Sequence, residues 1–283
     1  MSSRKKLKMV TLNTEGASEY ERCASESRAP FIQVQNVSKR YSSRLGDMVE
    51  AIDHVSFTVA HGEFISLVGP SGCGKTTLLN ILGGLLPATE GFVRFDGLPP
   101  GASRPGLGVV FQDAVLLPWR TVLQNVLLPV EVTHREARAG KEKALRLIEL
   151  VGLQGFDNKF PFELSGGMQQ RASIARALVT EPSLLLMDEP FGALDALTRE
   201  SMAAELQRIW LNSRQTVLFI THSILEAIFL SDRIVIMSGR PSRVKEIVSV
   251  QLPRPRTLEM TTQRECVAYI ERIRAVLQEE TSH

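Results

Sequence analysis

The sequence predicts an α/β fold with a parallel β-sheet core, an antiparallel β subdomain and an inserted α-helical subdomain. Two observations carry this prediction. Short apolar runs at residues 184–187 and 216–220 are each followed by a helical pattern, which is typical of buried parallel strands. Between residues 113 and 178, strand signals give way to helical periodicity, which indicates a helical insertion.

Composition sets the broad class of the protein. Of its 283 residues, 43% are apolar and 23% are charged, as in a globular protein made of one large domain or two modest ones. The formal net charge of +2 argues against nucleic acid as a partner. No uninterrupted apolar run approaches the ~20 residues that cross a bilayer.

The cysteines and the amino-terminal segment bear on the compartment. Cys23, Cys73 and Cys266 lie far apart and lack metal-ligand spacing, so we expect the reducing cytosol. The basic start is followed by no apolar stretch, so no secretory signal is expected. Residues 1–30 are polar and aperiodic, which favours a flexible leader.

Strand signals begin after this leader. Residues 31–37 alternate in polarity, and a second strand at 55–59 follows a turn region at 45–47. A turn at residues 61–62 leads into a third strand at 64–68.

A helix follows the third strand and ends near Gly83 and Gly84. Residues 91–97 predict a short antiparallel strand between turns, and residues 107–111 predict a further strand that ends at Gln112.

Two amphipathic faces support the helical insertion. One face consists of Leu123, Val126, Leu127 and Val130, and the other, approximately, of Ala144, Leu145, Ile148 and Val151. After the two buried strands, residues 234–237 add one more strand, and residues 254–256 interrupt the chain before a last helix at about 262–278. For that helix, regulation, dimer support and plain packing are the alternatives. No internal repeat is visible, so we expect one copy of the domain.

The segment between the strand at 64–68 and the next helix has the spacing of a phosphate-binding P-loop, G-x-x-x-x-G-K-[ST]. The candidate nucleotide-binding residues are Gly69, Pro70, Ser71, Gly72, Cys73, Gly74, Lys75, Thr76 and Thr77. Glycines expose backbone N–H groups, and the positive end of the helix faces the phosphates. Lys75 supplies a charge for the outer phosphates, and the Thr76 hydroxyl can bind Mg²⁺. A Gly-rich turn is the alternative, but the flanking strand and helix favour binding of a nucleoside triphosphate.

A strand that ends in two acids predicts the second part of this site. Asp188 and Glu189 follow the run at 184–187, at the edge of the sheet where ligands bind. Asp188 would anchor Mg²⁺, and Glu189 would polarise a water for attack on the γ-phosphate. An ordinary acidic turn is the alternative.

Ser165, Gly166 and Gly167 predict a second anion site. Ser165 has the character of an N-cap, and the glycines expose N–H groups at a helix start. A plain capped helix would explain the serine but not the glycines, which weaken a helix start. Two anion sites on one chain suggest that one ATP is held between two copies.

Together with the P-loop, residues 164–171 and 186–190 resemble the ATP-binding subunits of ABC transporters in order and spacing. The likeness runs from about residue 31 to about residue 255. It implies a RecA-like P-loop NTPase fold, ATP and Mg²⁺ as cofactors, and a homodimer with ATP between the copies. The implied domains are residues 31–256, with the helical subdomain at about 113–178, and a helical extension at 257–283.

The resemblance also implies roles for single residues. Tyr41 matches the aromatic residue that stacks on adenine, and Asp195 matches the loop that crosses the dimer interface. Gln112 matches the glutamine that reaches Mg²⁺ and the attacking water and senses the membrane subunit. His222 matches the switch histidine that contacts the γ-phosphate. Ser223 departs from the pattern, where aspartate is usual. A strand-edge Tyr41 and a structural His222 are the alternatives.

The implied catalytic residues are Lys75, Gln112, Glu189 and His222, and the implied Mg²⁺ ligands are Thr76, Gln112 and Asp188. Ser165, Gly166, Gly167 and Asp195 join Tyr41 and the P-loop as implied nucleotide contacts.

Within the family, the chain is most similar to the nitrate/sulfonate/taurine importers. The likeness rests on residues 117–120 (LPWR), 125–126, 190–199 and 240–241. In that group Leu-Pro-Trp lies where the coupling helix of the membrane subunit docks. An exposed Trp119 would suit such a surface, and the alternative is a Trp119 packed within the helical insertion.

The resemblance therefore implies an ATPase peripheral to the cytoplasmic face of the inner membrane. Its implied partners are a second copy, two permease subunits and, indirectly, a periplasmic or lipoprotein solute-binding protein. Nitrate, alkanesulfonate, taurine and pyrimidine precursors are all compatible substrates.

The rival is a soluble non-transport ABC ATPase, but such proteins generally carry two cassettes or a long coiled coil. Exporters commonly fuse the cassette to membrane helices, and a binding-only regulator would lack Glu189 or His222.

Overall fold

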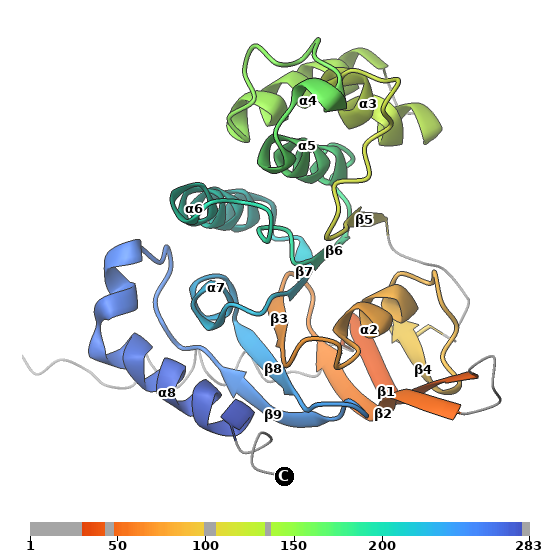
Figure 1. The fold of residues 1–283 in the computed structure, drawn as a ribbon, viewed down its shortest axis with the longest axis vertical. Coiled ribbons are helices and arrows are strands. Elements are labelled where there is room, and N and C mark those ends of the chain that lie inside the picture. The colour runs from red at the N-terminus through yellow and green to blue at the C-terminus, as the bar shows by residue number, and fades with distance from the viewer. Residues whose placement is uncertain (1–29, 43–47, 99–105, 134–136, 279–283) are drawn as a thin grey trace, which may run out of the picture.

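The computed structural model describes residues 30–42, 48–98, 106–133 and 137–278. The expected leader, except for its last residue, and the expected turn at 45–47 lie outside the described residues. Within the described ranges the chain has the predicted α/β fold, with one large sheet, one small antiparallel sheet and a separate group of helices (Figure 1).

The larger sheet has, within the described ranges, six strands in the order β5-β6-β7-β3-β8-β9. Adjacent strands of this sheet run parallel to each other, except for the pair β8 and β9, which is antiparallel. The strands are β3 (Phe64–Val68), β5 (Leu107–Val110), β6 (Leu184–Asp188), β7 (Thr216–Ile220), β8 (Arg233–Met237) and β9 (Val244–Ser249). Sequence patterns do not predict β9, because charged residues interrupt its apolar positions.

The central strands are buried on both faces. Every residue of β3, β6 and β7 is buried. Leu185 and Met187 of β6 join one apolar cluster, whereas Leu184 and Leu186 join another. Because side chains alternate along a strand, the two clusters lie on opposite faces of the sheet.

The smaller sheet is antiparallel, in the order β2-β1-β4. Its strands are β1 (Ile32–Ser42), β2 (Met48–Val59) and β4 (Glu90–Phe95). The strand predicted at 55–59 is therefore the second half of a longer one. The register of β1 against β2 shifts at several points, and such bulges break the alternation that a sequence pattern needs.

The helical insertion lies at the top of Figure 1 and shares an apolar cluster with the larger sheet. It contains α3 (Val122–Val132), α4 (Ala137–Leu150), the 3₁₀ turn η1 (Pro161–Glu163) and α5 (Gly166–Leu178). The predicted face on α4 is wrong at Leu145, which is 40% exposed, while Ala144 and Ile148 are buried. A residue that follows another directly on a helix is turned about 100° away, so Leu145 leaves the face.

The other helices are α2 (Lys75–Leu82), α6 (Ala196–Ser213), α7 (Ile224–Leu230), the 3₁₀ turn η2 (Leu258–Thr262) and α8 (Arg264–Gln278). The last helix begins at Arg264, and Thr262 belongs to the preceding 3₁₀ turn. Cys266 and Ile273 of α8 are buried in a cluster with Ala227 and Ile228 of α7, so α8 packs on the core.

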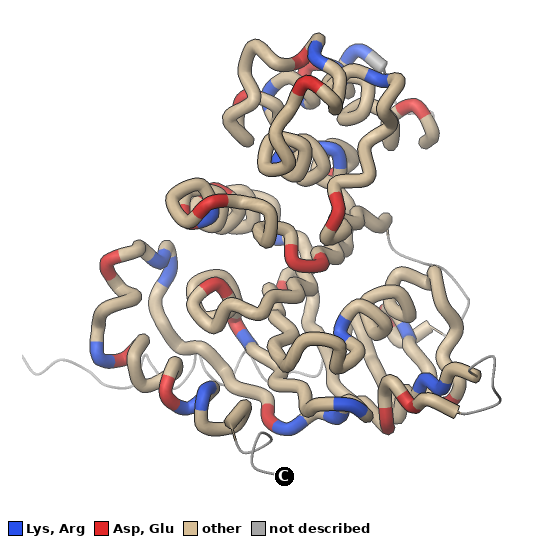
Figure 2. Tube along the Cα trace, in the orientation of Figure 1, with Lys and Arg blue, Asp and Glu red and all other residues tan. Residues whose placement is uncertain are grey.

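Charged residues of both signs are interspersed along the chain (Figure 2), in keeping with a net charge of +2. Among the described helices, none has the length and apolar character needed to span a membrane.

Candidate active site

The predicted P-loop joins β3 to α2, at the carboxyl end of the strand. Gly72 has φ 72° and Gly74 has φ 118°, a backbone region that favours glycine. A Cβ on Gly74 would lie 2.8 Å from the carbonyl oxygen of Ala51, whereas one on Gly72 would meet no atom within 4 Å. The loop is therefore tight on its inner side and open on its outer side, as a phosphate cradle requires.

Lys75 lies at the start of α2 and is 5% exposed. Its Nζ donates hydrogen bonds to the carbonyl oxygens of Gly69, at 2.9 Å, and Pro70, at 2.8 Å. The ammonium group therefore packs against the P-loop, next to the position predicted for the phosphates.

A cavity of about 310 Å³ opens beside the loop. It is lined by Ser71, Gly72, Gly74, Lys75, Thr76, Thr77, Gln112, Glu189 and Arg240. The fold therefore brings the P-loop together with the predicted Gln112 and Glu189. Arg240, which follows β8, is not among the predicted site residues; in the sequence it stands out only as part of residues 240–241, one of the segments that carry the subfamily likeness.

Asp188 ends β6 directly before Glu189; it does not line the cavity itself and is only 3% exposed. Burial raises the pKa of its carboxyl group, although a hydrogen bond with the side chain of Thr76 and the nearby Lys75 oppose the rise. A carboxylate, a hydroxyl and the amide oxygen of Gln112 are the hard oxygen ligands that Mg²⁺ prefers, together with water and phosphate. The residues present therefore fit Mg²⁺.

Glu189 and His222 lie side by side at the ends of β6 and β7. His222 Nδ1 is 3.1 Å from Glu189 Oε2. Glu189 has φ 44°, an uncommon conformation for a residue with a side chain, and its N–H donates to the carbonyl oxygen of Ile220 at 2.9 Å. Strain of this kind gathers at functional sites, and Glu189 is one of the residues that line the cavity.

Tyr41 lies on β1 with 40% of its surface exposed. Its hydroxyl oxygen is 3.4 Å from Oγ1 of Thr77, and Lys39 Nζ lies 5.4 Å from its ring centre. An exposed ring beside the P-loop is placed where a nucleotide base could stack.

The predicted second anion site lies elsewhere in the chain. Ser165 caps α5 by accepting a hydrogen bond from the N–H of Met168, at 3.3 Å. Asp195 caps α6 by accepting one from the N–H of Thr198, at 3.0 Å. A Cβ on Gly167 would lie 3.1 Å from Cδ2 of Leu194, so these two segments adjoin. Neither lines the P-loop cavity, so this chain does not bring them to its own phosphate site.

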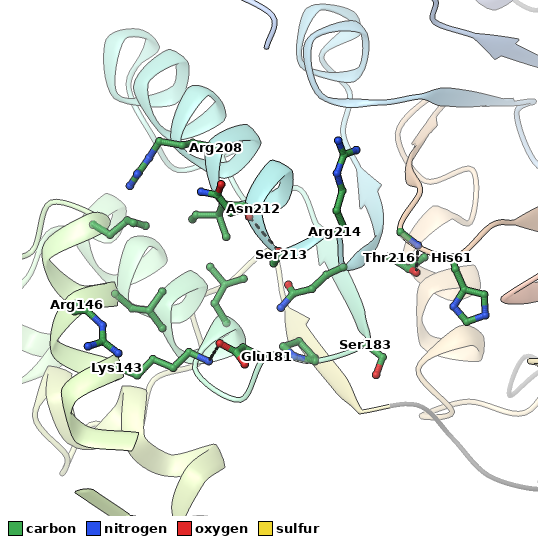
Figure 3. A pocket seen from close by; sticks show the side chains of 17 residues that line it. His61, Lys143, Arg146, Glu181, Ser183, Arg208, Asn212, Ser213, Arg214 and Thr216 are labelled. Atoms are coloured by element: carbon green, nitrogen blue, oxygen red, sulfur yellow. Dashed lines mark hydrogen bonds and ion pairs between the residues drawn. The ribbon is translucent and has the colours of Figure 1, made fainter. Parts of the chain in front are cut away.

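A larger cavity, of about 860 Å³, lies at the amino ends of β6 and β7 (Figure 3). Two of its basic side chains are engaged with neighbours: Lys143 Nζ lies 2.7 Å from Glu181, and the guanidinium of Arg214 lies over the ring of Trp210. Ligands of parallel sheets bind at the carboxyl ends of strands, so the smaller cavity is the candidate active site.

Comparison with known proteins agrees with this geometry. A family model described as ABC transporter matches residues 52–192. An ABC transporter ATP-binding protein of Methanocaldococcus jannaschii is 46% identical, covering 88% of this chain and 92% of its own. A taurine import ATP-binding protein of Rhizobium johnstonii is 49% identical, covering 76% and 82%. A bicarbonate transport ATP-binding protein of Synechocystis is 42% identical, covering 88% and 89%.

A solved ATP-binding cassette, a dimer in a post-hydrolysis state bound to ADP and Pi, has a TM-score of 0.71 and 33% identity. The match covers 78% of this chain and all of that one (100%).

Proposed function

Because this chain belongs to the ABC transporter family and is an ATP-binding cassette ATPase, we propose that it powers a membrane importer for a small anion. The observation that carries the proposal is the cavity at which the P-loop, Gln112 and Glu189 meet. The proposed ATP-binding unit is residues 31–256, with 257–283 as an extension.

In the proposed reaction, the P-loop and Lys75 bind the phosphates of ATP. Glu189 accepts a proton from the attacking water, and His222 holds the Glu189 carboxylate from 3.1 Å away. Thr76, Asp188 and Gln112 would hold Mg²⁺, which when bound neutralises charge on the phosphates.

Two copies complete each site in this proposal. Ser165 and Asp195 lie away from the cavity of their own chain, and the family includes cassettes solved as dimers. We propose that Ser165, Gly166 and Gly167 of one copy close over the ATP on the other.

The proposed permease contact is the loop after Gln112. Trp119 is 71% exposed and Val115 is 60% exposed, so a Trp119 packed inside the helical insertion is wrong. Exposed apolar side chains next to a residue of the cavity suit a partner that must respond to ATP. We propose that two permease subunits dock here and hold the dimer at the cytoplasmic face of the membrane.

The proposed cargo is a small anion, because one relative is named for taurine and another for bicarbonate.

Purification of the tagged chain from membranes tests the proposal that it serves an importer. Recovery with a multi-span permease and a solute-binding protein is expected, whereas recovery with ribosomes or DNA and no permease would favour the non-transport alternative.

Replacement of Trp119 by Ser tests the docking surface. The isolated chain should keep its ATPase rate within about twofold, while recovery of permease should fall by about 10-fold or more, because exposed aromatic residues are common interface anchors. Leu258→Ser is the matched control, since Leu258 is also exposed, at 43%, and lies in η2. Equal recovery of permease with Trp119→Ser and Leu258→Ser would contradict this surface.

A further inference from the structure

The start of α6 and the start of α7 are joined by an ion pair that the proposed reaction does not use. Nε of Arg199, in the first turn of α6, lies 3.6 Å from Oε1 of Glu226, in the first turn of α7. Arg199 also donates from Nη2 to the carbonyl oxygen of Leu194, at 3.3 Å. Arg199 therefore contacts both the loop that ends at Asp195 and the helix that follows His222.

Glu226 in turn holds the backbone around His222. Its Oε2 accepts a hydrogen bond from the Thr221 hydroxyl at 2.5 Å, and that hydroxyl oxygen accepts one from the N–H of Ser223 at 3.0 Å. The Glu226 side chain is only 10% exposed. Burial raises its pKa, while Thr221 and Arg199 oppose the rise.

This arrangement differs from an ordinary helix start. Ser223 caps α7 by accepting a hydrogen bond from the N–H of Glu226, at 3.3 Å. In a capping box, the glutamate at this position would return to the N–H of the serine. Here Thr221 takes that N–H, which leaves the second oxygen of Glu226 free to face Arg199.

The pair is close but incomplete. A charge-assisted hydrogen bond is normally about 2.7–2.9 Å long, shorter than the 3.6 Å between Arg199 and Glu226. Nε of Arg199 is buried and has no hydrogen-bond partner among the described residues. Buried donors are rarely left unsatisfied, so a small movement of the loop at 194–199 would complete the bond.

We propose that Arg199 and Glu226 are positioning residues that link the two ATP sites of the dimer. When the loop at Asp195 meets the second copy, the distance between Arg199 and Glu226 shortens. Glu226, through its hydrogen bond with Thr221, then holds His222 beside Glu189. The inference rests on the proposed dimer, because that loop must meet the second copy.

Steady-state ATPase measurements on Arg199→Met, Glu226→Gln and the double variant test the link. Each single variant should lower kcat by roughly 10-fold, the size of a typical coupling between sites, and should reduce the Hill coefficient from near 2 toward 1. KM should stay within about twofold, because neither residue lines the cavity. The kcat of the double variant should be no lower than that of the less active single variant, since both substitutions remove the same contact.

Two further variants separate positioning from folding. Arg199→Lys keeps the charge and should recover part of the lost cooperativity. Arg208→Met removes an exposed arginine of α6 that pairs with Glu205, and it should behave as wild type. Single-variant losses that multiply in the double variant, or an unchanged Hill coefficient, would overturn the inference.

A second measurement does not depend on turnover. In a Glu189→Gln background, Arg199→Met should weaken ATP-dependent dimer formation by about 10-fold, and an unchanged dimer would again overturn the inference. A wild-type chain that hydrolyses no ATP would instead contradict the proposed reaction. The dimer measurement would then still test whether Arg199 and Glu226 link the two ATP sites.

Discussion

Glu189→Gln is expected to lower ATP turnover by at least ~10²-fold while leaving ATP binding intact, because glutamine keeps the shape of the side chain but cannot accept the proton of the attacking water. The P-loop contacts proposed to bind the phosphates do not involve Glu189. ATP should therefore still close the dimer, and the closed state should last longer than in the wild type.

The measurements are single-turnover ATP hydrolysis, equilibrium binding of a fluorescent ATP analogue, and dimer lifetime by gel filtration. Glu149→Gln, which changes an exposed carboxylate on α4, is the matched control and should stay within about twofold of wild type. Near-normal hydrolysis by Glu189→Gln would exclude Glu189 as the base. A loss of nucleotide binding with unchanged chemistry would assign it to binding instead.

The sequence predicts the centre of the fold better than its edges. Strands β6 and β7 are recognisable because both faces are covered, so the four residues of β6 before Asp188 and the four of β7 after Thr216 are all apolar. The edge strand β9 carries Lys245 and Glu246, and its pattern resembles a loop. The first half of β2 is hidden for a different reason, since bulges against β1 break its alternation.

In the candidate site too, some residues can be predicted from the sequence and others cannot. Lys75, Asp188 and Glu189 lie in local patterns that a strand–loop–helix context makes recognisable. Arg199 and Arg240 lie in segments that indicate only the subfamily, and Glu226 lies in no recognised pattern, because contacts between distant segments create the environment of all three. A sequence pattern therefore finds the residues proposed to act directly on ATP, Mg²⁺ or water more readily than the residues proposed to position them.

The carboxyl-terminal segment offers the largest expected effect on stability, at Arg256. This side chain is 4% exposed, and burial lowers its pKa to about 10, so it stays charged at neutral pH. Its guanidinium donates to the carbonyl oxygens of Ile228, Phe229, Ser231, Val250 and Leu252. Three of these oxygens belong to the end of α7, where an arginine stabilises the unpaired carbonyls of a helix.

The backbone of Arg256 is fixed as well. Its N–H donates to Oε1 of Gln207 at 2.7 Å, and Nε2 of Gln207 donates to its carbonyl oxygen at 2.8 Å. Because Gln207 belongs to α6, this one residue ties the segment after β9 to both α6 and α7.

Arg256→Met should therefore lower the free energy of unfolding by about 3–5 kcal/mol, because methionine fills the space of the stem but leaves buried carbonyl oxygens without a donor. The melting temperature should fall by roughly 10 °C, measured by thermal unfolding of the nucleotide-free chain. Arg208→Met, on the exposed face of α6, should shift it by no more than about 2 °C. Arg256→Lys should fall between the two, since an ammonium group can satisfy some of the carbonyls but lacks the guanidinium fork. If Arg256→Met melts within about 2 °C of wild type, the carbonyl oxygens must find water or other donors, and the segment after β9 is not what holds the end of α7.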